Sequence, residues 1–364
     1  MTDVLRVALT LEQCWHRVPG GTAVAALGMA RALASRGDVE LVGVAALHRG
    51  APRGWKPPTD VLALPLPRLA LYESWHRLRW PQVQRATGSV DVVHATSLAV
   101  PPRSAPLVVT IHDLAWVHEP GHFTRHGVSF FEAGLALARA EADLVLCSSE
   151  ATLRDCEAAG FDHKRLRLVP LGVDAVPASV ADVERVRRRY GLAAPYVLWT
   201  GTVEPRKNLG GLLRAFADVG ADADLVLVGP QGWNEDLGAL VSGAPRVRPL
   251  GFVPAADLAP LYAGARLLCF PSLLEGFGFP VLEAMAQGTP VVTSTGTSTE
   301  ELAGDAAVLV DPRDPAAIAA GMKQVLCDEE LHTTLSAAGR ARAALYTWER
   351  CAELVRRAYE EVAA

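Results

Sequence analysis

Two glutamates, Glu275 and Glu283, flank a Gly-Phe-Gly-Phe turn in the segment from Pro271 to Val292. An apolar run precedes the turn, and a helix is expected to start at Pro280, because the fixed φ of proline suits the first turn of a helix. Backbone N–H groups at a helix start attract anions, and glycines allow close backbone approach. The pattern therefore predicts an anion site suited to a diphosphate. The residues of the turn are Gly276, Phe277, Gly278 and Phe279.

The two carboxylates indicate which chemical groups are linked to the bound anion. Carboxylates beside a phosphate site are unexpected unless they bind hydroxyl groups, and their oxygens accept hydrogen bonds from vicinal diols well. A nucleotide sugar offers sugar hydroxyls, a diphosphate and a ribose diol in one row. We expect Glu275 in the loop and Glu283 in the first helical turn to face one pocket. The alternative is two acids that only stabilise a helix N-terminus.

A second loop supplies positive charge. The predicted strand Tyr196–Gly201 is followed by Arg206 and Lys207, and a helix begins near Asn208. Two cations at the carboxyl end of a strand can neutralise a diphosphate as it leaves. The alternative is a basic loop that only faces solvent.

The first half of the chain contains two weaker candidates. Gly20 and Gly21 precede a predicted helix capped by Thr22, which makes a second possible anion site, although an ordinary turn explains the pair equally well. His112 ends a buried strand, where its ring is expected to act as a hydrogen-bond donor in a cleft between domains. A histidine satisfied within the core is the alternative.

Alternating strands and helices must position these residues. Near-continuous Val and Leu runs predict strands covered on both faces, as in parallel α/β sheets. The alternation restarts after about residue 175, so we predict two doubly wound domains joined by Pro170–Ser179. The predicted strands are Leu5–Leu9, Val39–Ala45, Val90–His94, Leu107–Ile111, Leu144–Ser148, Tyr196–Gly201, Asp224–Gly229, Val247–Leu250, Ala265–Phe270, Pro290–Thr293 and Ala307–Val310.

Composition limits the classes of protein. The 364 residues carry a net charge of −5, which argues against nucleic acid as the main partner. The six cysteines are scattered without a Cys-x-x-Cys pair, which favours buried thiols in a reducing cytosol. We expect no signal peptide and no membrane-spanning helix, because no apolar run reaches about 18 residues. The predicted location is cytoplasmic.

The motifs together resemble a known family. The segments GTVEPRKNL, LGFVP, FPSLLEGFGFPVLEAMAQGTPVVTS and GDAAVLVDP are similar to those of GT-B glycosyltransferases of family 4, and PGG, DVVHATS and TIHDL agree. The resemblance covers nearly the whole chain, and its most specific part is the E-x7-E block. It implies two Rossmann-like domains facing across a cleft, residues 1–170 for the acceptor and 171–347 for the nucleotide sugar, with a helix at 348–364 packing back on the first domain.

The same resemblance assigns roles to the carboxylates and the histidine. Glu275 would hold hydroxyls of the transferred sugar near the reacting carbon, and His112 would help to position that sugar. Glu283 would hold the ribose diol. The amides of Gly276–Phe279 would bind sugar and phosphate oxygens.

The resemblance also indicates which residues bind the charged diphosphate. Arg206 and Lys207 would take that charge as the diphosphate leaves, while Gly20 and Gly21 would close over it. Many relatives have an arginine directly after the strand glycine. Here Thr202 follows Gly201, so the cation role falls to Arg206 with Lys207. Two residues of the LGFVP segment would lie along the base, largely through their backbone. These are Phe252 and Val253.

The predicted function is therefore retaining transfer of a hexosyl group from a nucleotide diphosphate sugar to a hydroxyl of a glycan, lipid-linked or small-molecule acceptor, without metal or other cofactor. GDP-mannose is favoured because EPRKN-type loops look common in mannosyl transferases. The alternatives are a GT-B epimerase or hydrolase, and a non-catalytic subunit that binds nucleotide sugars.

Three further segments are given other roles. Asp222–Asp224 resembles the metal-binding Asp-x-Asp of another glycosyltransferase fold but precedes a strand, so we expect a solvated turn. His118, His122 and His126 have helical spacing that Pro-Gly interrupts, which argues against a metal site. The basic, aromatic stretch Leu71–Gly88 is expected to be a solvated helix face, and the alternatives are a surface that binds an anionic acceptor or one that makes peripheral contact with the inner membrane face.

Overall fold

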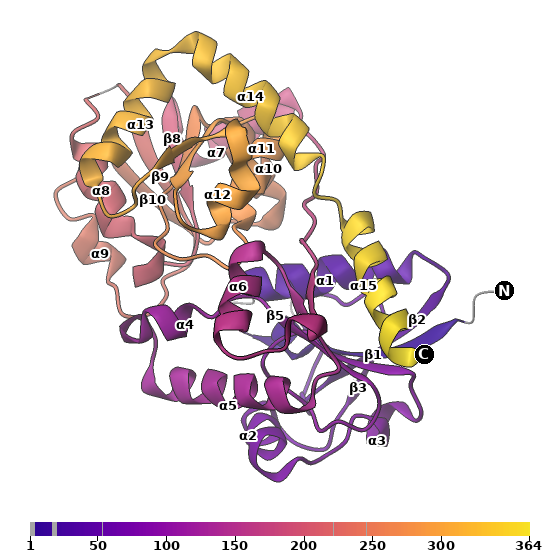
Figure 1. The fold of residues 1–364 in the computed structure, drawn as a ribbon. Helices are drawn as coiled ribbons and strands as arrows, with labels where there is room; N and C mark the ends of the chain where they lie inside the picture. The colour runs from indigo at the N-terminus through magenta and orange to yellow at the C-terminus, as the bar shows by residue number, and fades with distance from the viewer. Residues whose placement is uncertain (1–3, 17–19, 53, 221, 245) are drawn as a thin grey trace. The chain divides into compact units, whose positions relative to one another are not determined.

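A computed structural model of the protein describes residues 4–16, 20–52, 54–220, 222–244 and 246–364. The chain divides into two compact units (Figure 1). Unit 1 comprises Met1–Gly172 and Thr347–Ala364, and unit 2 comprises Val173–Tyr346. Each unit is an α/β domain built on one parallel sheet, which confirms the predicted fold class.

Unit 1 contains a seven-stranded sheet in the order β3-β2-β1-β4-β5-β6-β7. All of its strand pairs are parallel. Its strands are β1 (Leu5–Thr10), β2 (Val39–Ala45), β3 (Val61–Ala63), β4 (Val92–Ala95), β5 (Leu107–Ile111), β6 (Leu144–Cys147) and β7 (Leu166–Leu168). Its helices are α1 (Gly20–Ala34), α2 (Arg68–Leu78), α3 (Gln84–Thr87), α4 (Ala115–His118), α5 (Arg125–Glu141), α6 (Glu150–Ala158) and α15 (Trp348–Ala363). Short 3-10 turns lie at Glu12–Trp15, Pro120–His122 and His163–Arg165.

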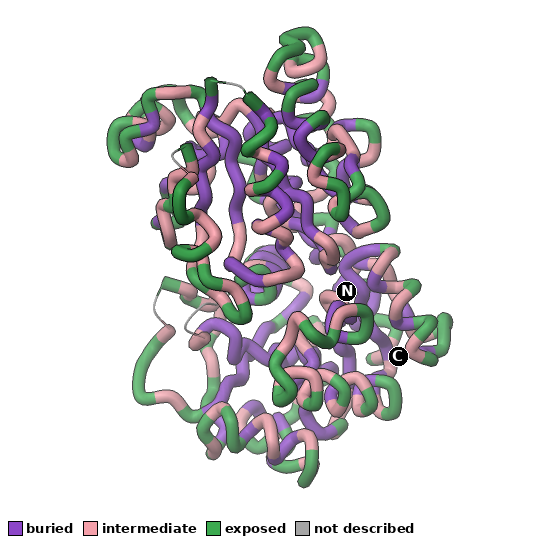
Figure 2. Tube along the Cα trace, turned by 90° about the vertical axis from the view of Figure 1, so that its left-hand side faces the viewer, coloured by how far each residue is buried: buried purple, intermediate pink, exposed green. Residues whose placement is uncertain are grey.

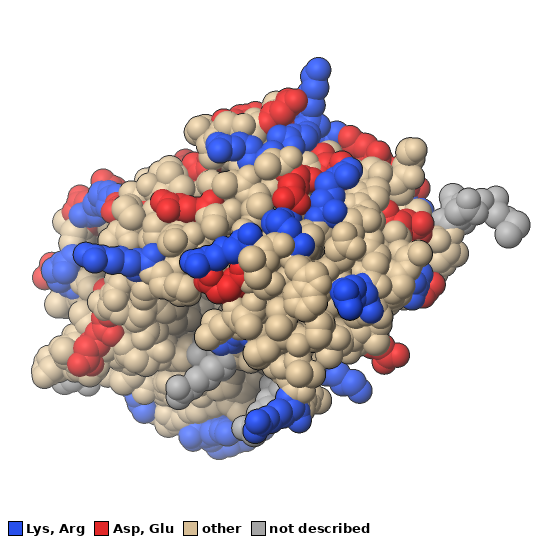
Figure 3. All heavy atoms as spheres, turned by 90° about the horizontal axis from the view of Figure 1, so that it is seen from below, with Lys and Arg blue, Asp and Glu red and all other residues tan. Residues whose placement is uncertain are grey.

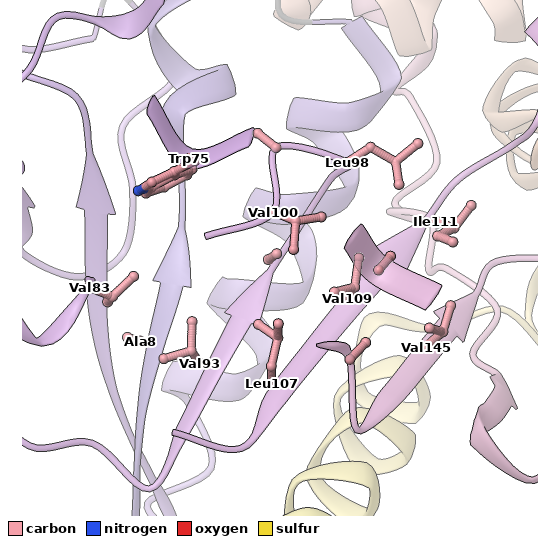
Figure 4. Close-up of a cluster of buried hydrophobic side chains, with 14 of the residues drawn as sticks. Ala8, Trp75, Val83, Val93, Leu98, Val100, Leu107, Val109, Ile111 and Val145 are labelled. Carbon is pink, nitrogen blue, oxygen red and sulfur yellow. The ribbon is translucent and has the colours of Figure 1, made fainter. Parts of the chain in front are cut away.

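The two faces of this sheet are covered by different helices, because successive strand residues point to opposite sides. In β4, Val93 belongs to an apolar cluster that includes Trp75 of α2 and Ala138 of α5 (Figure 4). The next residue, His94, instead lies against Tyr359 of α15, with 2.7 Å between its Nδ1 and the phenol oxygen. The last helix of the chain therefore completes the core of unit 1, beside α1.

Unit 2 contains a six-stranded parallel sheet in the order β10-β9-β8-β11-β12-β13. Its strands are β8 (Tyr196–Thr200), β9 (Asp224–Val228), β10 (Val247–Gly251), β11 (Leu267–Phe270), β12 (Val291–Ser294) and β13 (Val308–Val310). Its helices are α7 (Val180–Tyr190), α8 (Leu209–Ala217), α9 (Leu237–Leu240), α10 (Ala255–Ala263), α11 (Phe279–Gln287), α12 (Ser298–Ala303), α13 (Pro315–Cys327) and α14 (Glu329–Ala343). Short 3-10 turns lie at Pro205–Lys207 and Gly304–Ala306.

Burial follows the strands. Every residue of β5, β6, β8 and β11 is buried. This is the reason that continuous Val and Leu runs predicted these strands. In Figure 2 the buried, purple segments gather in the interior, and the outer coils of the trace carry buried, intermediate and exposed residues in turn. On the face drawn in Figure 3, Lys and Arg lie interspersed with Asp and Glu. Among the residues that the structure describes, no helix is both long and apolar enough to span a membrane.

The acids of the Asp222–Asp224 segment serve as ion-pair partners. Asp222 pairs with Arg246, and Asp224 Oδ2 lies 3.4 Å from Nη1 of Arg248. Asp224 is the first residue of β9, so it lies at the amino end of the strand. Ligands of such sheets bind beyond the opposite end.

Candidate active site

The basic loop of unit 2 is fixed by hydrogen bonds to segments that follow other strands of the sheet. After β8, Pro205–Lys207 forms a single 3-10 turn, and Asn208 adopts the left-handed conformation with φ 54° before α8 begins. The Nδ2 of Asn208 donates hydrogen bonds to the carbonyls of Pro271, at 3.0 Å, and Pro312, at 2.6 Å. The first bond attaches the loop to the segment that follows β11, and the second attaches it to the segment that follows β13. The positions of Arg206 and Lys207 are therefore fixed relative to the glutamate segment.

Both cations of this loop contact Glu275. The Nζ of Lys207 lies 2.5 Å from Oε1 of Glu275, and Nη1 of Arg206 lies 3.2 Å from Oε2. The Nε of Arg206 also pairs with Glu204 Oε1 at 2.9 Å. The four side chains are largely buried, and Arg206 is the most exposed at 19%. The cluster contains two cations and two carboxylates, so the cations predicted for a diphosphate are already paired with carboxylates.

This cluster lies where a ligand of the sheet is expected. The strand order of unit 2 runs outward in both directions from the adjacent pair β8 and β11, which makes that pair the topological switch point. Parallel α/β sheets bind ligands beyond the carboxyl ends of the strands at this point. Lys207 follows β8 and Glu275 follows β11, so their contact spans the switch point.

Burial and charge act in opposite directions on this cluster. Burial alone would raise the pKa of Glu275, but Lys207 and Arg206 outweigh it and hold that pKa below its usual value. Burial, assisted by Arg206, lowers the pKa of Lys207, while Glu275 and Glu204 oppose the shift. Glu275 is therefore a carboxylate at neutral pH because of its two cationic partners.

The glycine turn is supported by Ser298, the first residue of α12. Ser298 Oγ donates hydrogen bonds to the carbonyls of Glu275, at 2.8 Å, and Phe277, at 3.1 Å. Gly278 has φ 105°, and a Cβ there would lie 2.8 Å from Cγ2 of Thr299. The position therefore requires glycine. Helix α11 starts at Phe279, and no side chain caps this start.

Glu283 lies further along α11 than the sequence indicated. It is the fifth residue of the helix, not part of the first turn, because α11 starts at Phe279. Its Oε2 accepts a hydrogen bond of 2.7 Å from the hydroxyl of Tyr262. Burial raises the pKa of Glu283, the Tyr262 hydrogen bond lowers it, and Asp174 raises it. The two glutamates thus have pKa values shifted in opposite directions.

The remaining residues predicted in unit 2 lie at the ends of β8 and β10. Gly201 follows β8, and Gly229 lies close to it. A Cβ on Gly229 would lie 1.8 Å from the carbonyl oxygen of Gly201. After β10, the Phe252 side chain is 71% exposed whereas Val253 is buried. A ligand can therefore reach Phe252 more readily than Val253.

In unit 1, His112 directly follows β5 and is half-buried. Its Nε2 lies 3.1 Å from the carbonyl oxygen of Thr96. A carbonyl only accepts, so Nε2 carries the proton. Burial lowers the pKa of the ring, which stays neutral, and Nδ1 is then an acceptor. The expectation that His112 donates a hydrogen bond to a ligand is therefore corrected: Nε2 donates to Thr96, and Nδ1 accepts.

The glycine pair of unit 1 also differs from its prediction. Helix α1 begins at Gly20, so Gly20 and Gly21 form its first turn and do not precede it, and Thr22 lies inside the helix. Gly20, the first residue of the helix, has φ 63°, a left-handed value that favours glycine. Both glycines are exposed. The neighbouring residues 17–19 lie outside the described part of the chain.

Sequence analysis missed three side chains of the unit 2 site. Glu204 resembles a solvated acid in a polar loop, yet it is 2% exposed. Tyr262 and Thr200 lie within apolar runs, where a single hydroxyl carries no pattern. The position of Thr200 at the carboxyl end of β8 is the one signal that could have identified it.

The chain matches two family models. "Glycosyltransferase Family 4" matches residues 19–176, and "Glycosyl transferases group 1" matches residues 194–328. An O-antigen chain mannosyltransferase B of Escherichia coli is 36% identical over 282 residues, which cover 74% of this chain and 74% of that protein. A D-inositol 3-phosphate glycosyltransferase of Geodermatophilus obscurus is 33% identical over 317 residues, covering 78% of this chain and 70% of that protein.

The fold agrees with these matches. The crystal structure of Anabaena HepE in complex with UDP and glucose superposes with a TM-score of 0.78 at 20% identity, covering 98% of this chain and 100% of that chain. The two parallel-sheet units therefore form the GT-B fold. The chain belongs to the family 4 glycosyltransferases, and it is a glycosyltransferase.

Proposed function

We propose that the enzyme transfers a mannosyl group from GDP-mannose to a hydroxyl acceptor with retention of anomeric configuration. The observation that carries the proposal is Glu275, held by Lys207 and Arg206 at the switch point of unit 2. A carboxylate that binds sugar hydroxyls beside two cations fits a sugar linked to a diphosphate. The E. coli relative named as a mannosyltransferase supports mannose, and thereby GDP, as the donor.

Each group then has a defined role. Glu275 accepts hydrogen bonds from hydroxyls of the sugar, and the amides of the glycine turn bind sugar and phosphate oxygens. Arg206 and Lys207 stabilise the charge that develops on the diphosphate. Glu283 binds the ribose diol. In unit 1, Nδ1 of His112 accepts a hydrogen bond from a sugar hydroxyl, and the first turn of α1 binds a diphosphate oxygen.

The proposed reaction is a same-face displacement. The bond between the anomeric carbon and the phosphate oxygen breaks while the acceptor oxygen bonds to that carbon on the same face. The acceptor proton passes to a diphosphate oxygen. Glu275 is occupied by two cations, which reduces its strength as a covalent nucleophile. We further propose that no metal is required, because Arg206 and Lys207 supply the positive charge.

We propose that unit 1 binds the acceptor and that its α2 region makes peripheral contact with an anionic membrane. Leu69, Leu78 and Trp80 are exposed there at 66%, 74% and 42%, and Arg85 lies over the Trp80 ring at 5.7 Å. Exposed apolar and basic side chains together suit a lipid interface. Co-sedimentation with anionic vesicles tests this contact. Loss of binding in Trp80→Ser is expected, and absence of binding in the unaltered protein contradicts it.

A thermal-shift panel of UDP, GDP, ADP and dTDP tests the sugar donor. A ligand at 100 times its Kd stabilises the folded state by about 2.7 kcal/mol, and we expect GDP to give the largest shift. A larger shift with another nucleotide reassigns the base, and no shift with any of the four overturns the donor site.

Incubation with GDP-mannose and methyl α-D-mannoside then tests the stereochemistry by NMR. An α-linked product is expected, and a β-linked product overturns same-face displacement.

A further inference from the structure

Three hydroxyl and carboxyl groups from different elements of unit 2 form a chain of hydrogen bonds. Thr200 Oγ1, at the end of β8, lies 2.7 Å from the phenol oxygen of Tyr262 in α10. The same phenol lies 2.7 Å from Oε2 of Glu283 in α11. Tyr262 and Thr200 are 1% and 5% exposed. The chain thus links the strand that carries the basic loop to the helix that carries Glu283.

The direction of each bond follows from chemistry. Burial, followed by the Glu283 charge, raises the pKa of Tyr262 well above its usual value, so the phenol keeps its proton. An ionised carboxylate only accepts hydrogen bonds. Tyr262 therefore donates a hydrogen bond to Glu283, and its oxygen accepts a hydrogen bond from the hydroxyl of Thr200. The hydroxyl of Thr200 orients the phenol, and the phenol orients the carboxylate.

This arrangement leaves one oxygen of Glu283 available. Oε2 is occupied by Tyr262, whereas Oε1 has no hydrogen-bond partner among the described residues. Glu283 is half-buried, so its side chain is not fully enclosed by protein. No basic side chain of the described residues forms an ion pair with Glu283. The groups that act on its charge are Tyr262 from α10 and Asp174 from the segment before α7.

We propose that Tyr262 is a positioning residue for the ribose of the nucleotide sugar: its hydroxyl fixes Glu283 so that Oε1 faces the ribose hydroxyls. The inference rests on the proposed function of Glu283. A phenylalanine would fill the same space in α10 with no buried hydroxyl to satisfy. The hydroxyl of Tyr262 is therefore explained by the carboxylate that it orients.

The variant Tyr262→Phe tests the proposal with two probes, GDP and 2′,3′-dideoxy-GDP, in calorimetric titrations. Loss of the orienting bond is expected to weaken GDP about tenfold. Dideoxy-GDP lacks the hydroxyls that Glu283 would bind, so its affinity should change by less than about twofold. A variant that merely distorts the fold would weaken both nucleotides equally, and that outcome overturns the proposal.

Tyr196→Phe is the matched control. Tyr196 is also fully buried in unit 2, and its hydroxyl donates a 2.6 Å hydrogen bond to the carbonyl of Leu261 and not to Glu283. Its removal is expected to lower stability by a similar amount and to leave the ratio of the two affinities unchanged. If Tyr262→Phe fails to fold, Thr200→Val is the second variant. It removes the hydrogen bond to the phenol while keeping the shape of the side chain at position 200. A weakening confined to GDP is expected there too, and an equal effect on both nucleotides overturns the proposal.

The pH profile of GDP binding provides a second readout. The Tyr262 hydrogen bond lowers the pKa of Glu283 and Asp174 raises it. Tyr262→Phe should therefore move the acid loss of GDP binding to higher pH, and Asp174→Asn should move it to lower pH. Unmoved profiles overturn the proposal.

If the unaltered protein binds no nucleotide, the proposed function is wrong and this inference is wrong with it. If the unaltered protein binds GDP and Tyr262→Phe matches it, only this inference falls.

Discussion

The Nζ of Lys207 lies 2.5 Å from Oε1 of Glu275, and the two residues follow adjacent strands at the switch point of the unit 2 sheet. The group proposed to bind the sugar and a group proposed to bind the diphosphate are thus hydrogen-bonded to each other. The cluster balances its own charge through Arg206 and Glu204. A diphosphate therefore competes with Glu275 for the cations, and sugar binding and phosphate binding are coupled.

Glu275→Gln is expected to lower the turnover number by about 100- to 1,000-fold, because a neutral amide stabilises neither the sugar hydroxyls nor the cations as a carboxylate does. GDP affinity should rise by up to about threefold, since the diphosphate no longer competes with a carboxylate for Lys207 and Arg206 while the base and ribose contacts remain. Loss of charge-assisted hydrogen bonds to Lys207 and Arg206 should cost about 2 kcal/mol of stability. Steady-state kinetics, calorimetry and urea denaturation measure the three effects.

The matched control for that change is Glu330→Gln, in an exposed position of α14. It should leave turnover, GDP affinity and the free energy of unfolding unchanged. Retention of more than about a tenth of the turnover number by Glu275→Gln would show that Glu275 does not contact the sugar in the transition state.

Lys207→Met is expected to reduce the turnover number by about 100-fold, because the leaving diphosphate loses one of its two cations. Lys207 also lowers the pKa of Glu275. Its removal should raise that pKa and shift the acid limb of the rate profile to higher pH. Lys323→Met, an exposed lysine of α13, serves as the control and should behave as the unaltered enzyme. A rate within about threefold of the original would exclude the assigned role.

Acidification should weaken GDP binding before it weakens the fold. The pKa of Glu283 is raised above its ordinary value of 4.5, so this carboxylate takes up its proton first. A raised pKa in the folded state means that this protonation stabilises the fold as the pH falls toward 4.5. The pKa of Glu275 is depressed below 4.5, so its contribution to stability is present above 4.5 and is lost only as the pH falls through its folded value.

Calorimetric GDP titrations and thermal unfolding over the same pH range measure these two effects separately. Glu283→Gln should bind GDP more weakly at neutral pH, and its affinity should no longer fall on acidification. An unchanged acid limb in that variant would assign the titration to another group.

The strand-end residues were predictable because their positions depend only on the alternation of strands and helices. Glu275 and Lys207 follow buried strands, and parallel strands bring such residues to one edge of a sheet. Their ion pair was not predictable, since spacing places each loop but not the direction of its side chains. The same holds for Tyr262, whose hydroxyl reaches Glu283 only through the packing of α10 against α11.

Elements with weak patterns were missed. Strands β3 and β7 have three residues each, and two of the three residues of β3 are exposed, so neither shows a continuous apolar run. The start of α1 was placed too late because glycine is a poor helix former, although the first turn of a helix tolerates it. These errors concern local propensity, which the tertiary packing of each unit overrides.

Gly28→Ala is expected to destabilise unit 1 by about 2 kcal/mol. A Cβ on Gly28 in α1 would lie 2.3 Å from Cζ2 of Trp348, the first residue of α15, so the helix or the ring must shift. In most helices this substitution gains about 0.5–1 kcal/mol. Gly210→Ala in α8 is the control, because its nearest neighbour would lie 3.7 Å away, and it should be neutral or stabilising.

A double-mutant cycle with Trp348→Ala identifies the cause of that loss. Without the indole ring, the Cβ that Gly28→Ala introduces has room, so the cost of this substitution should largely disappear. Urea denaturation of the four proteins gives the coupling free energy, which we expect to be about 1–2 kcal/mol. Additive effects of the two substitutions would show that the contact between α1 and the last helix does not set the requirement for glycine at position 28.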